Sequence, residues 1–314
     1  MQTSRATDRR TAFTLVELLA STAVLALLVT VLGGIFSQVS RTWIAGEGGV
    51  ERRRSARAMT DFIAAELRGA AAPVDRVSTK GKNNLQLLIN PPSGVLPDDC
   101  VNADSIFWQA PIATETTFGD LAEIGYFVRW DPNSTTSRQP TLCRFFVNPS
   151  TIVAGKPESN PLFLIYSKPQ WLTADLVRKV APATAPAFRG LFAENVAGLW
   201  VRAFQPDGAE LFTEGKKTYD SRLGYRYKVA NGTTQERFLP ARVQVSIAQF
   251  DAAGAVQLDA LGSKVRALVK KESVHDAGDF LAELQAATKD EPAMSRLLPG
   301  LRIHTTEVRL ENSR

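Results

Sequence analysis

The sequence predicts an α+β protein. A long N-terminal helix, membrane-spanning in its first half, precedes an antiparallel β-rich domain with a helical insertion near the C-terminus. Three observations carry this prediction. An uncharged apolar run covers residues 18–39, apolar residues then recur at helical spacing as far as Ala70, and short strand-like segments begin at Leu85.

The composition is that of an ordinary globular protein. Of the 314 residues, 44% are hydrophobic and 22% are charged, and the formal net charge is +5. A chain of this length can bury a core of its own, so folding is not expected to depend on disulfides. The basic surplus is spread along the chain, which argues against nucleic acid as a partner. The cysteines and histidines are too widely spaced for a compact zinc finger, so no metal site or cofactor is predicted.

The apolar run over residues 18–39 is long enough to cross a membrane, because a helix of about 20 residues spans a hydrocarbon core of about 30 Å. Arg5, Arg9 and Arg10 precede the run, and the positive-inside rule keeps that end in the cytoplasm while the remaining chain is exported. A cleaved secretory signal is the rival interpretation. Its apolar region, however, is normally about 7 to 15 residues long and ends at an A-x-A-like site.

Glu17 is an ionisable residue at the start of this apolar region. Such a group at membrane depth costs roughly 2.5 to 3.5 kcal/mol or more unless it has a partner. In one interpretation Glu17 lies near the cytoplasmic interface and reaches headgroup water. In the other it pairs with a positive group inside a bundle of helices.

Residues 12–19, Ala-Phe-Thr-Leu-Val-Glu-Leu-Leu, resemble the class III signal of type IV pilins and type II secretion pseudopilins. The match consists of a short basic leader, Phe at the new N-terminus, Glu four positions later and an uncharged helix after it. The resemblance implies that a prepilin peptidase cuts between Ala12 and Phe13 and that the new amine of Phe13 is methylated. The sequence departs from the family at Ala12, where the family nearly always has Gly.

Cleavage would supply the positive group that Glu17 needs. Loss of residues 1–12 removes three Arg and one Asp, so the formal side-chain charge falls from +5 to +3, and a free α-amine appears at Phe13. In a bundle of such helices, the Glu17 carboxylate can meet the amine of a neighbouring subunit, and each relieves the other's desolvation. This pairing would set the axial register of assembly, and the resemblance implies the same role for Glu17.

An amphipathic stretch is expected to continue the helix over residues 40–72. Its apolar stripe consists of Met59, Phe62, Ile63, Leu67 and Ala70, at mostly three- and four-residue spacing. Charged side chains occupy the opposite face, and the helix should end before Pro73. One apolar stripe predicts docking on a globular domain.

The chain after Leu85 predicts antiparallel strands, because apolar, β-branched and aromatic segments alternate with Pro, Gly, Asn and Asp. The expected strands cover residues 85–89, 105–108, 123–130, 142–147, 162–166, 196–204, 211–212, 243–250 and 301–310. Asp207-Gly208 supplies the positive φ angles that a tight hairpin needs. The helix-prone stretch over residues 255–299 is expected as an insertion before the last strand.

The order of these segments is similar to that of the J-type minor pseudopilins. The resemblance is carried by FIAAELR at residues 62–68, ENV at 194–196, Asp207-Gly208 and LPARV at 239–243. The insertion departs from that pattern, and the proportions resemble the large pilin-like cassette proteins of verrucomicrobial type. The resemblance implies a leader over residues 1–12, a transmembrane and assembly helix over 13–39, its amphipathic continuation over 40–72, and a pilin-like β-rich domain over 73–314.

No catalytic motif is present, so the chain is not predicted to be an enzyme. Cys100 and Cys143 fall in the exported part, where oxidation is permitted. They form either one disulfide or two independent buried thiols, since the sequence contains no distance information.

These patterns predict a minor pseudopilin-like structural subunit, cut after Ala12 and assembled through its N-terminal helix. The expected location is the inner membrane, crossed once, with the N-terminus cytoplasmic and the main domain periplasmic. The expected partners are other pilin or pseudopilin subunits, the prepilin peptidase, and a secreted substrate or outer-membrane channel touched by the β domain as tip or adaptor. The alternative is a signal-anchored periplasmic module that never polymerises and binds a glycan or a protein.

Overall fold

The computed structural model describes residues 57–73, 85–182, 190–212, 217–229 and 232–312, together with Thr22, Leu25 and Thr30. The chain divides into two compact units, Met1–Arg54 and Ser55–Arg314. In the first unit the three described residues are helical. The second unit contains a further helix over residues 57–68, called helix 57–68 below, and all the named elements.

In chain order the named elements are β1 (Leu88–Ile89), η1 (Asp98–Cys100), β2 (Ile106–Ala110), β3 (Ala122–Arg129), β4 (Thr141–Val147), β5 (Ser150–Val153), β6 (Lys156–Ser159), α2 (Ala174–Val180), β7 (Leu191–Glu194), β8 (Val196–Phe204), β9 (Tyr219–Asp220), η2 (Ser221–Leu223), β10 (Tyr225–Lys228), β11 (Thr234–Arg237), β12 (Arg242–Phe250), α3 (Ala252–Val269), α4 (Ala277–Ala287), η3 (Pro292–Gly300) and β13 (Leu301–Arg309). All their strand pairings are antiparallel. The prediction of an α+β fold with antiparallel sheets is therefore confirmed.

One part of the predicted fold class, the membrane-spanning helix, is wrong for the described residues. Within the described residues, no helix combines the length and the apolar character needed to cross a membrane. The longest named helix, α3, has 18 residues, and these include Asp259, Lys264 and Arg266, whose charges are costly in hydrocarbon. The segment predicted to span, residues 13–39, lies outside the described residues except for Thr22, Leu25 and Thr30.

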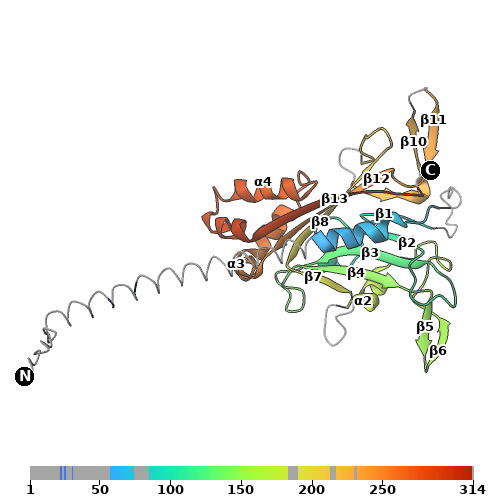
Figure 1. Cartoon of the computed structure of the whole chain (residues 1–314), viewed down its shortest axis with the longest axis horizontal. Helices are drawn as coiled ribbons and strands as arrows, with labels where there is room; N and C mark the ends of the chain where they lie inside the picture. Colours follow the sequence, from blue (N-terminus) through green and yellow to red (C-terminus); the bar gives the residue numbers. More distant parts are fainter. Residues whose placement is uncertain are drawn as a thin grey trace, which may run out of the picture. The chain divides into compact units, whose positions relative to one another are not determined.

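Two sheets form the centre of the second unit (Figure 1). The larger has six strands in the order β7-β4-β3-β2-β1-β9, and the smaller has three in the order β13-β12-β8. Between β7 and β8 stands Asn195, whose φ of 60° is a left-handed value that Asn tolerates better than most residues. The chain passes from the larger sheet to the smaller at this residue. The pairs β5–β6 and β10–β11 form separate hairpins.

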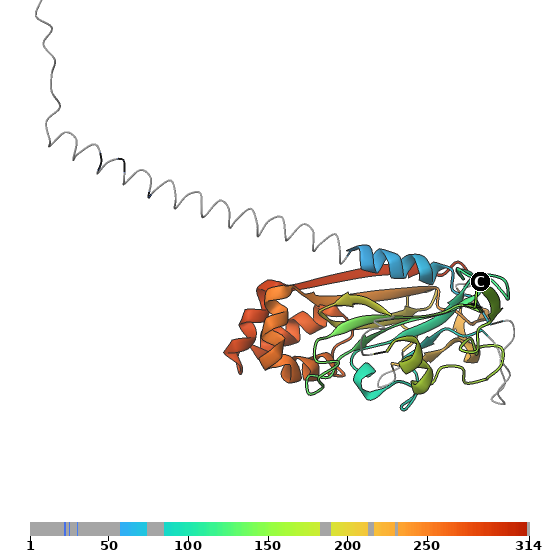
Figure 2. The ribbon, with the colours of Figure 1, turned by 90° about the horizontal axis from the view of Figure 1, so that it is seen from below.

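The larger sheet is covered on both faces, which explains why β3 is buried along its whole length. Ile124 and Tyr126 belong to the main core, which also contains residues of helix 57–68. Phe127 belongs to a second apolar cluster, which includes Trp171 and residues of α2. Figure 2 shows helix 57–68 and α2 on opposite sides of the strands. Successive side chains of a strand point to opposite faces, so β3 contributes to both cores.

Helix 57–68 docks on the sheets through its apolar stripe. Met59, Ile63 and Leu67 are buried. Phe62 differs from the prediction, because its side chain is 45% exposed and lies at the margin of the contact, with its ring 5.4 Å from that of Phe192. The stripe predicts the direction in which the helix docks, but it does not predict how far the sheet extends beneath each residue.

Glu66 fastens this helix to the larger sheet. It is 7% exposed and accepts hydrogen bonds from Tyr126 Oη at 2.5 Å and Arg144 Nε at 3.2 Å. A second nitrogen of Arg144 completes a bidentate ion pair with the carboxylate. The Arg144 guanidinium also lies 4.0 Å from the centre of the Phe146 ring. Because bidentate arginine–carboxylate pairs are directional as well as strong, they fix the helix position.

The predicted insertion contains α3, α4 and η3, which lie between β12 and β13 in sequence and pack on the smaller sheet. Both α-helices begin at an aspartate. Asp251 accepts a hydrogen bond from Gly254 N at 2.8 Å, and Asp276 accepts bonds from Gly278 N and Asp279 N at 2.7 and 2.9 Å. These bonds satisfy backbone donors that have no partner within the helix.

Two expected strands are absent from the named elements. Residues 162–166 form turns, and the amides of Leu164 and Ile165 donate to the Glu123 carboxylate, each at 2.8 Å, in place of a strand partner. The strand expected at residues 211–212 is also absent, and the nearby pairing is an isolated antiparallel bridge between Phe204 and Glu210. Apolar composition alone does not distinguish a strand from an apolar turn that is held by a buried side chain.

Candidate functional site

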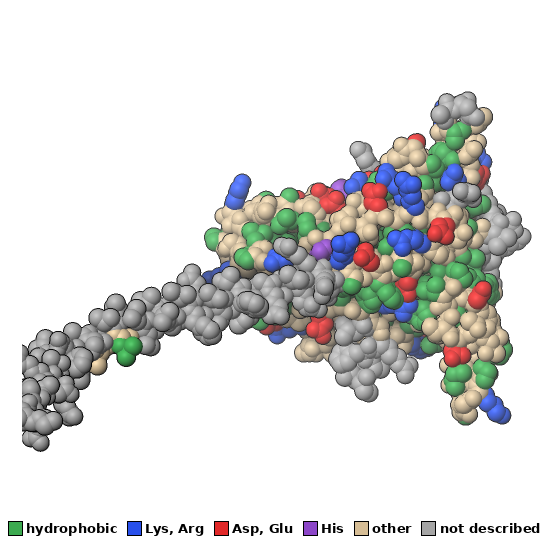
Figure 3. Space-filling model, viewed as in Figure 1, with side chains coloured by type: hydrophobic (Ala, Val, Ile, Leu, Met, Phe, Trp, Pro, Cys, Tyr) green, Lys and Arg blue, Asp and Glu red, His purple; other side chains and the backbone are tan. Residues whose placement is uncertain are grey.

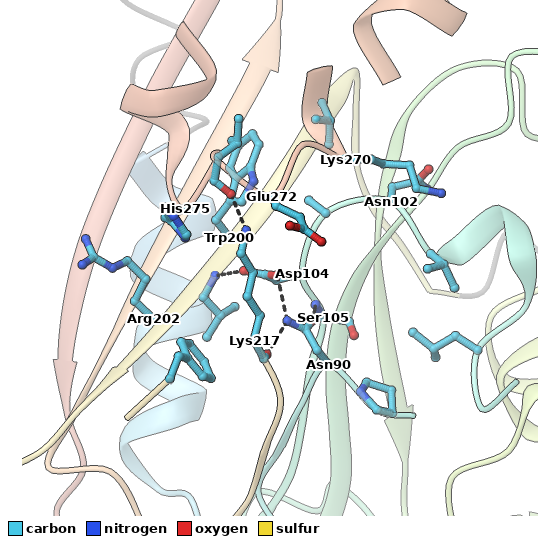
Figure 4. A pocket seen from close by; sticks show the side chains of 18 of the residues that line it. Asn90, Asn102, Asp104, Ser105, Trp200, Arg202, Lys217, Lys270, Glu272 and His275 are labelled. Atoms are coloured by element: carbon cyan, nitrogen blue, oxygen red, sulfur yellow. Dashed lines mark hydrogen bonds between the residues drawn. The ribbon is translucent and has the colours of Figure 1, made fainter. Parts of the chain in front are cut away.

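A cavity of about 750 Å³ lies within the second unit (Figure 4). Its wall consists of residues from the β1–β2 connection, from β8, and from positions 269–275 at the end of α3 and the turn that follows, together with Glu210, Phe212 and Lys217. Its volume falls in the range of small-molecule sites, about 300 to 1,000 Å³. We therefore treat this cavity as the candidate functional site.

Asp104 joins the two sheets at the cavity wall. Its backbone N–H donates to Leu199 O at 2.8 Å, and its Oδ2 accepts a hydrogen bond from Val201 N at 2.9 Å. Asp104 thus pairs with the edge of β8 that β12 leaves free. The residue is 8% exposed, and this burial raises the pKa of its carboxyl, while the hydrogen bonds from Val201 and Asn90 act in the opposite direction.

The Asn90 side chain makes three hydrogen bonds at this part of the cavity wall. Its Oδ1 accepts a bond from Ser105 N at 2.8 Å, and its Nδ2 donates to Asp104 Oδ1 at 2.8 Å and to Lys217 O at 2.7 Å. Its φ is 51°, a left-handed value that few residue types other than Asn and Gly adopt readily. The three bonds offset this conformational cost and bring residues 90, 104 and 217 together.

Two donors at the wall have bonding capacity to spare. Lys217 Nζ donates to Val274 O at 2.7 Å, and an ammonium group has three donors in all. Trp200 is 1% exposed, and its Nε1–H has no hydrogen-bond partner in the described part of the chain. A buried polar group without a partner costs roughly 1 to 3 kcal/mol.

The position of the Trp200 ring depends on Gly198. The ring packs against Phe280, with the centroids 5.5 Å apart. A Cβ atom at Gly198 would come within 2.3 Å of the ring. Gly198 therefore leaves the space that Trp200 occupies.

The charged side chains that line the cavity fall into two groups. Arg202 is paired with Glu210 at 2.8 Å, and Lys271 is paired with Glu283 at 2.7 Å. Among the described residues, the side chains of Lys270 and Glu272 have no hydrogen-bond or ion-pair partner. Figure 4 shows Glu272 together with Trp200, Asp104 and Lys217 among the labelled side chains of the wall. Within the described part of the chain, Lys270 and Glu272 are therefore an unpaired base and an unpaired acid in the cavity wall.

The described residues contain no cluster of three or more His, Cys, Asp or Glu side chains that could hold a metal ion. On the face shown in Figure 3, basic and acidic side chains are interspersed. Arg242 and Glu307, on β12 and β13, form an ion pair at 2.9 Å. Interspersed charges give this face a weaker field than a patch of one sign would.

The predicted site residues have different outcomes. Ala12, Phe13 and Glu17 lie outside the described residues. Cys100 and Cys143 are both free, both buried and both in the second apolar cluster, so the structure contains the two-thiol alternative. Burial raises the pKa of both thiols, although Arg129 acts against this shift.

The cavity itself was not predicted from the sequence, because its wall combines segments as far apart as residues 90 and 275. One signal was available: Asp104 directly precedes a strand that was correctly expected near residues 105–108. A polar residue next to a buried strand needs a partner, but the sequence does not identify β8 as that partner. No family model, curated protein or solved structure matches the chain.

Proposed function

We propose that this chain is a pilin-like structural subunit of the minor pseudopilin type. The observation that carries the proposal is the octapeptide at residues 12–19, with its small residue before Phe13 and its carboxylate at Glu17. In this proposal a prepilin peptidase cuts after Ala12, Phe13 becomes the methylated N-terminus, and residues 13–39 assemble with other subunits. Residues 55–314 then face an extracytoplasmic compartment as a tip or adaptor domain.

The attachment of helix 57–68 supports this proposal. A filament subunit must transmit the position of its assembly segment to the domain that it carries. The buried ion pair between Glu66 and Arg144, together with the Tyr126 hydrogen bond, ties the helix to the middle of the larger sheet. A domain attached in this way keeps a defined orientation on its helix, as an adaptor requires.

The proposal is tested by co-isolation of two differently tagged copies from cells that contain the native assembly system. Glu17→Ala is expected to abolish co-isolation, because the amine of a neighbouring Phe13 loses its carboxylate partner. Asp61→Ala is the matched control. It removes a carboxylate whose side chain is 62% exposed, and it should assemble normally. Normal co-isolation of Glu17→Ala would contradict the proposal.

A non-polymerising binding module is the second candidate, and the cavity favours it. The cavity has the volume of a small-molecule site, and the Lys270 and Glu272 side chains that line it have no partner in the described residues. The Glu17 experiment distinguishes the two candidates, since a binding module should fold, be exported and bind its ligand normally without this carboxylate.

A further inference from the structure

The cavity offers separate donors and acceptors to a ligand. On the donor side is Lys217 Nζ, which bonds Val274 O with one of its three hydrogens. On the acceptor side is the carboxylate of Glu272, which has no partner among the described residues. Figure 4 shows Lys217 and Glu272 among the side chains that line the cavity.

The balance of charge argues against a ligand of one sign. Arg202 and Lys271 are neutralised by Glu210 and Glu283, so they do not add to the field. The remaining cations of the wall are Lys217 and Lys270, and its remaining acids are Glu272 and Asp104, whose two oxygens accept hydrogen bonds from Asn90 and Val201. A simple anion would face two carboxyl groups and a simple cation two ammonium groups. A ligand that carries both charges meets a partner for each.

Trp200, although it lines the cavity, gives a glycan no ring to stack on, and the ring of Phe212 in the same wall is partly buried. Sugar rings usually bind by stacking their apolar face on an exposed aromatic ring. Trp200 is 1% exposed and its ring packs against Phe280, so the ring is not available for stacking. The apolar part of the wall is mainly aliphatic and includes Pro92, Leu96 and Val101. This lining suits aliphatic side chains.

We infer that the cavity binds a zwitterionic ligand of the amino-acid or short-peptide class, with its carboxylate at Lys217 and its ammonium group at Glu272. The two spare hydrogens of Lys217 Nζ would donate to that carboxylate. The site is then a receptor for free chain termini. This inference does not depend on filament assembly, and it holds equally for a binding module.

The test uses the purified full-length chain and saturation-transfer NMR. The probes are a pool of tripeptides randomised at every position and, separately, a mixture of the free amino acids. At least one of them should show saturation transfer, and which one does distinguishes a peptide from an amino acid. The same pools with acetylated amines and amidated carboxyls should bind at least about tenfold more weakly, since each lost charge pair removes roughly 1.4 kcal/mol or more.

Variants locate the binding. Glu272→Gln changes an exposed side chain and should weaken binding by about tenfold without lowering the melting temperature. Lys217→Met should weaken it similarly, and its melting curve shows whether the fold is kept. Glu311→Gln and Lys289→Met are matched controls at exposed positions away from the cavity, and both should bind normally. Equal binding of capped and free pools, unchanged binding by Glu272→Gln, or binding of mixed oligosaccharides alone would overturn the inference.

Discussion

Gln109 and Glu123 lie directly opposite each other across β2 and β3, and each keeps one polar atom without a hydrogen-bond partner in the described residues. Both side chains are fully buried. Glu123 Oε1 accepts the amides of Leu164 and Ile165, while Gln109 Oε1 accepts Gln86 N. The unpartnered atoms are Gln109 Nε2 and Glu123 Oε2, a donor and an acceptor on the same face of the sheet.

Glu123 should make stability depend on pH. Burial raises the pKa of Glu123 to about 8, against the opposing effect of its two backbone hydrogen bonds. Between its ordinary pKa and about pH 8, the folded state keeps a proton that the unfolded state releases, so stability falls as pH rises. The fall due to this group is on the order of 3 to 5 kcal/mol.

Urea unfolding at several pH values measures this dependence. Glu123→Gln keeps a carbonyl oxygen for the Leu164 and Ile165 amides but cannot ionise, so its stability should change much less between pH 5 and pH 8. Glu158→Gln, on the exposed strand β6, should keep the wild-type dependence. If the stability of the wild type and of Glu123→Gln changed with pH in the same way, Glu123 would be ionised in the folded state and this prediction would be wrong.

The attachment of helix 57–68 should depend on Glu66. Glu66→Ala leaves the Arg144 guanidinium and the Tyr126 hydroxyl without their shared partner, and removing one member of a buried pair costs roughly 3 to 5 kcal/mol. Because the Arg144 side chain is 23% exposed and can reach water, we expect about 3 kcal/mol in urea unfolding. Asp61→Ala, on the exposed face of the same helix, should cost less than about 1 kcal/mol. Equal effects of the two substitutions would contradict this role.

The space above Gly198 should be essential for the Trp200 ring. A methyl group there would approach the ring to 2.3 Å, so Gly198→Ala should displace Trp200, cost roughly 1 to 3 kcal/mol and change the near-ultraviolet circular dichroism. At Gly69 the nearest atoms to an added Cβ are 3.7 Å away, which is ordinary contact. Gly69→Ala should therefore stay within about 0.5 kcal/mol of the wild type and keep its spectrum.

The two cysteines should be present as inert thiols. Both are buried and burial raises the pKa of each, so the reactive thiolate is disfavoured. Iodoacetamide should leave the native chain unmodified and should alkylate both residues after unfolding without a reductant, as mass spectrometry would show. Alkylation only after reduction would identify a Cys100–Cys143 disulfide instead.

Local patterns predicted much of the fold. The strand expected at residues 196–204 matches β8, and those expected at 243–250 and 301–310 match β12 and β13 to within one residue at each end. These strands alternate apolar and polar residues or lie between clear turn residues, so their limits are visible in the sequence. The helical character of residues 255–299 was visible in the same way.

Long-range pairings could not be predicted. Nothing next to Glu66 identifies Arg144, 78 positions away, as its partner, and nothing next to Asp104 identifies Val201. The short α2 was not predicted because a helix of seven residues has too few turns to show helical periodicity. The cavity consists of such pairings, which explains why it became visible only in three dimensions.

The central claim is that the chain is processed as a pilin-like subunit. It is tested most directly by the N-terminal mass of the protein purified from cells that contain its own prepilin peptidase. The account predicts a chain that starts at Phe13 and carries a methyl group on its amine, and it predicts a chain that starts at Met1 when the peptidase is absent. A start at Met1 in the presence of the peptidase, or a start after Gly34, would contradict it.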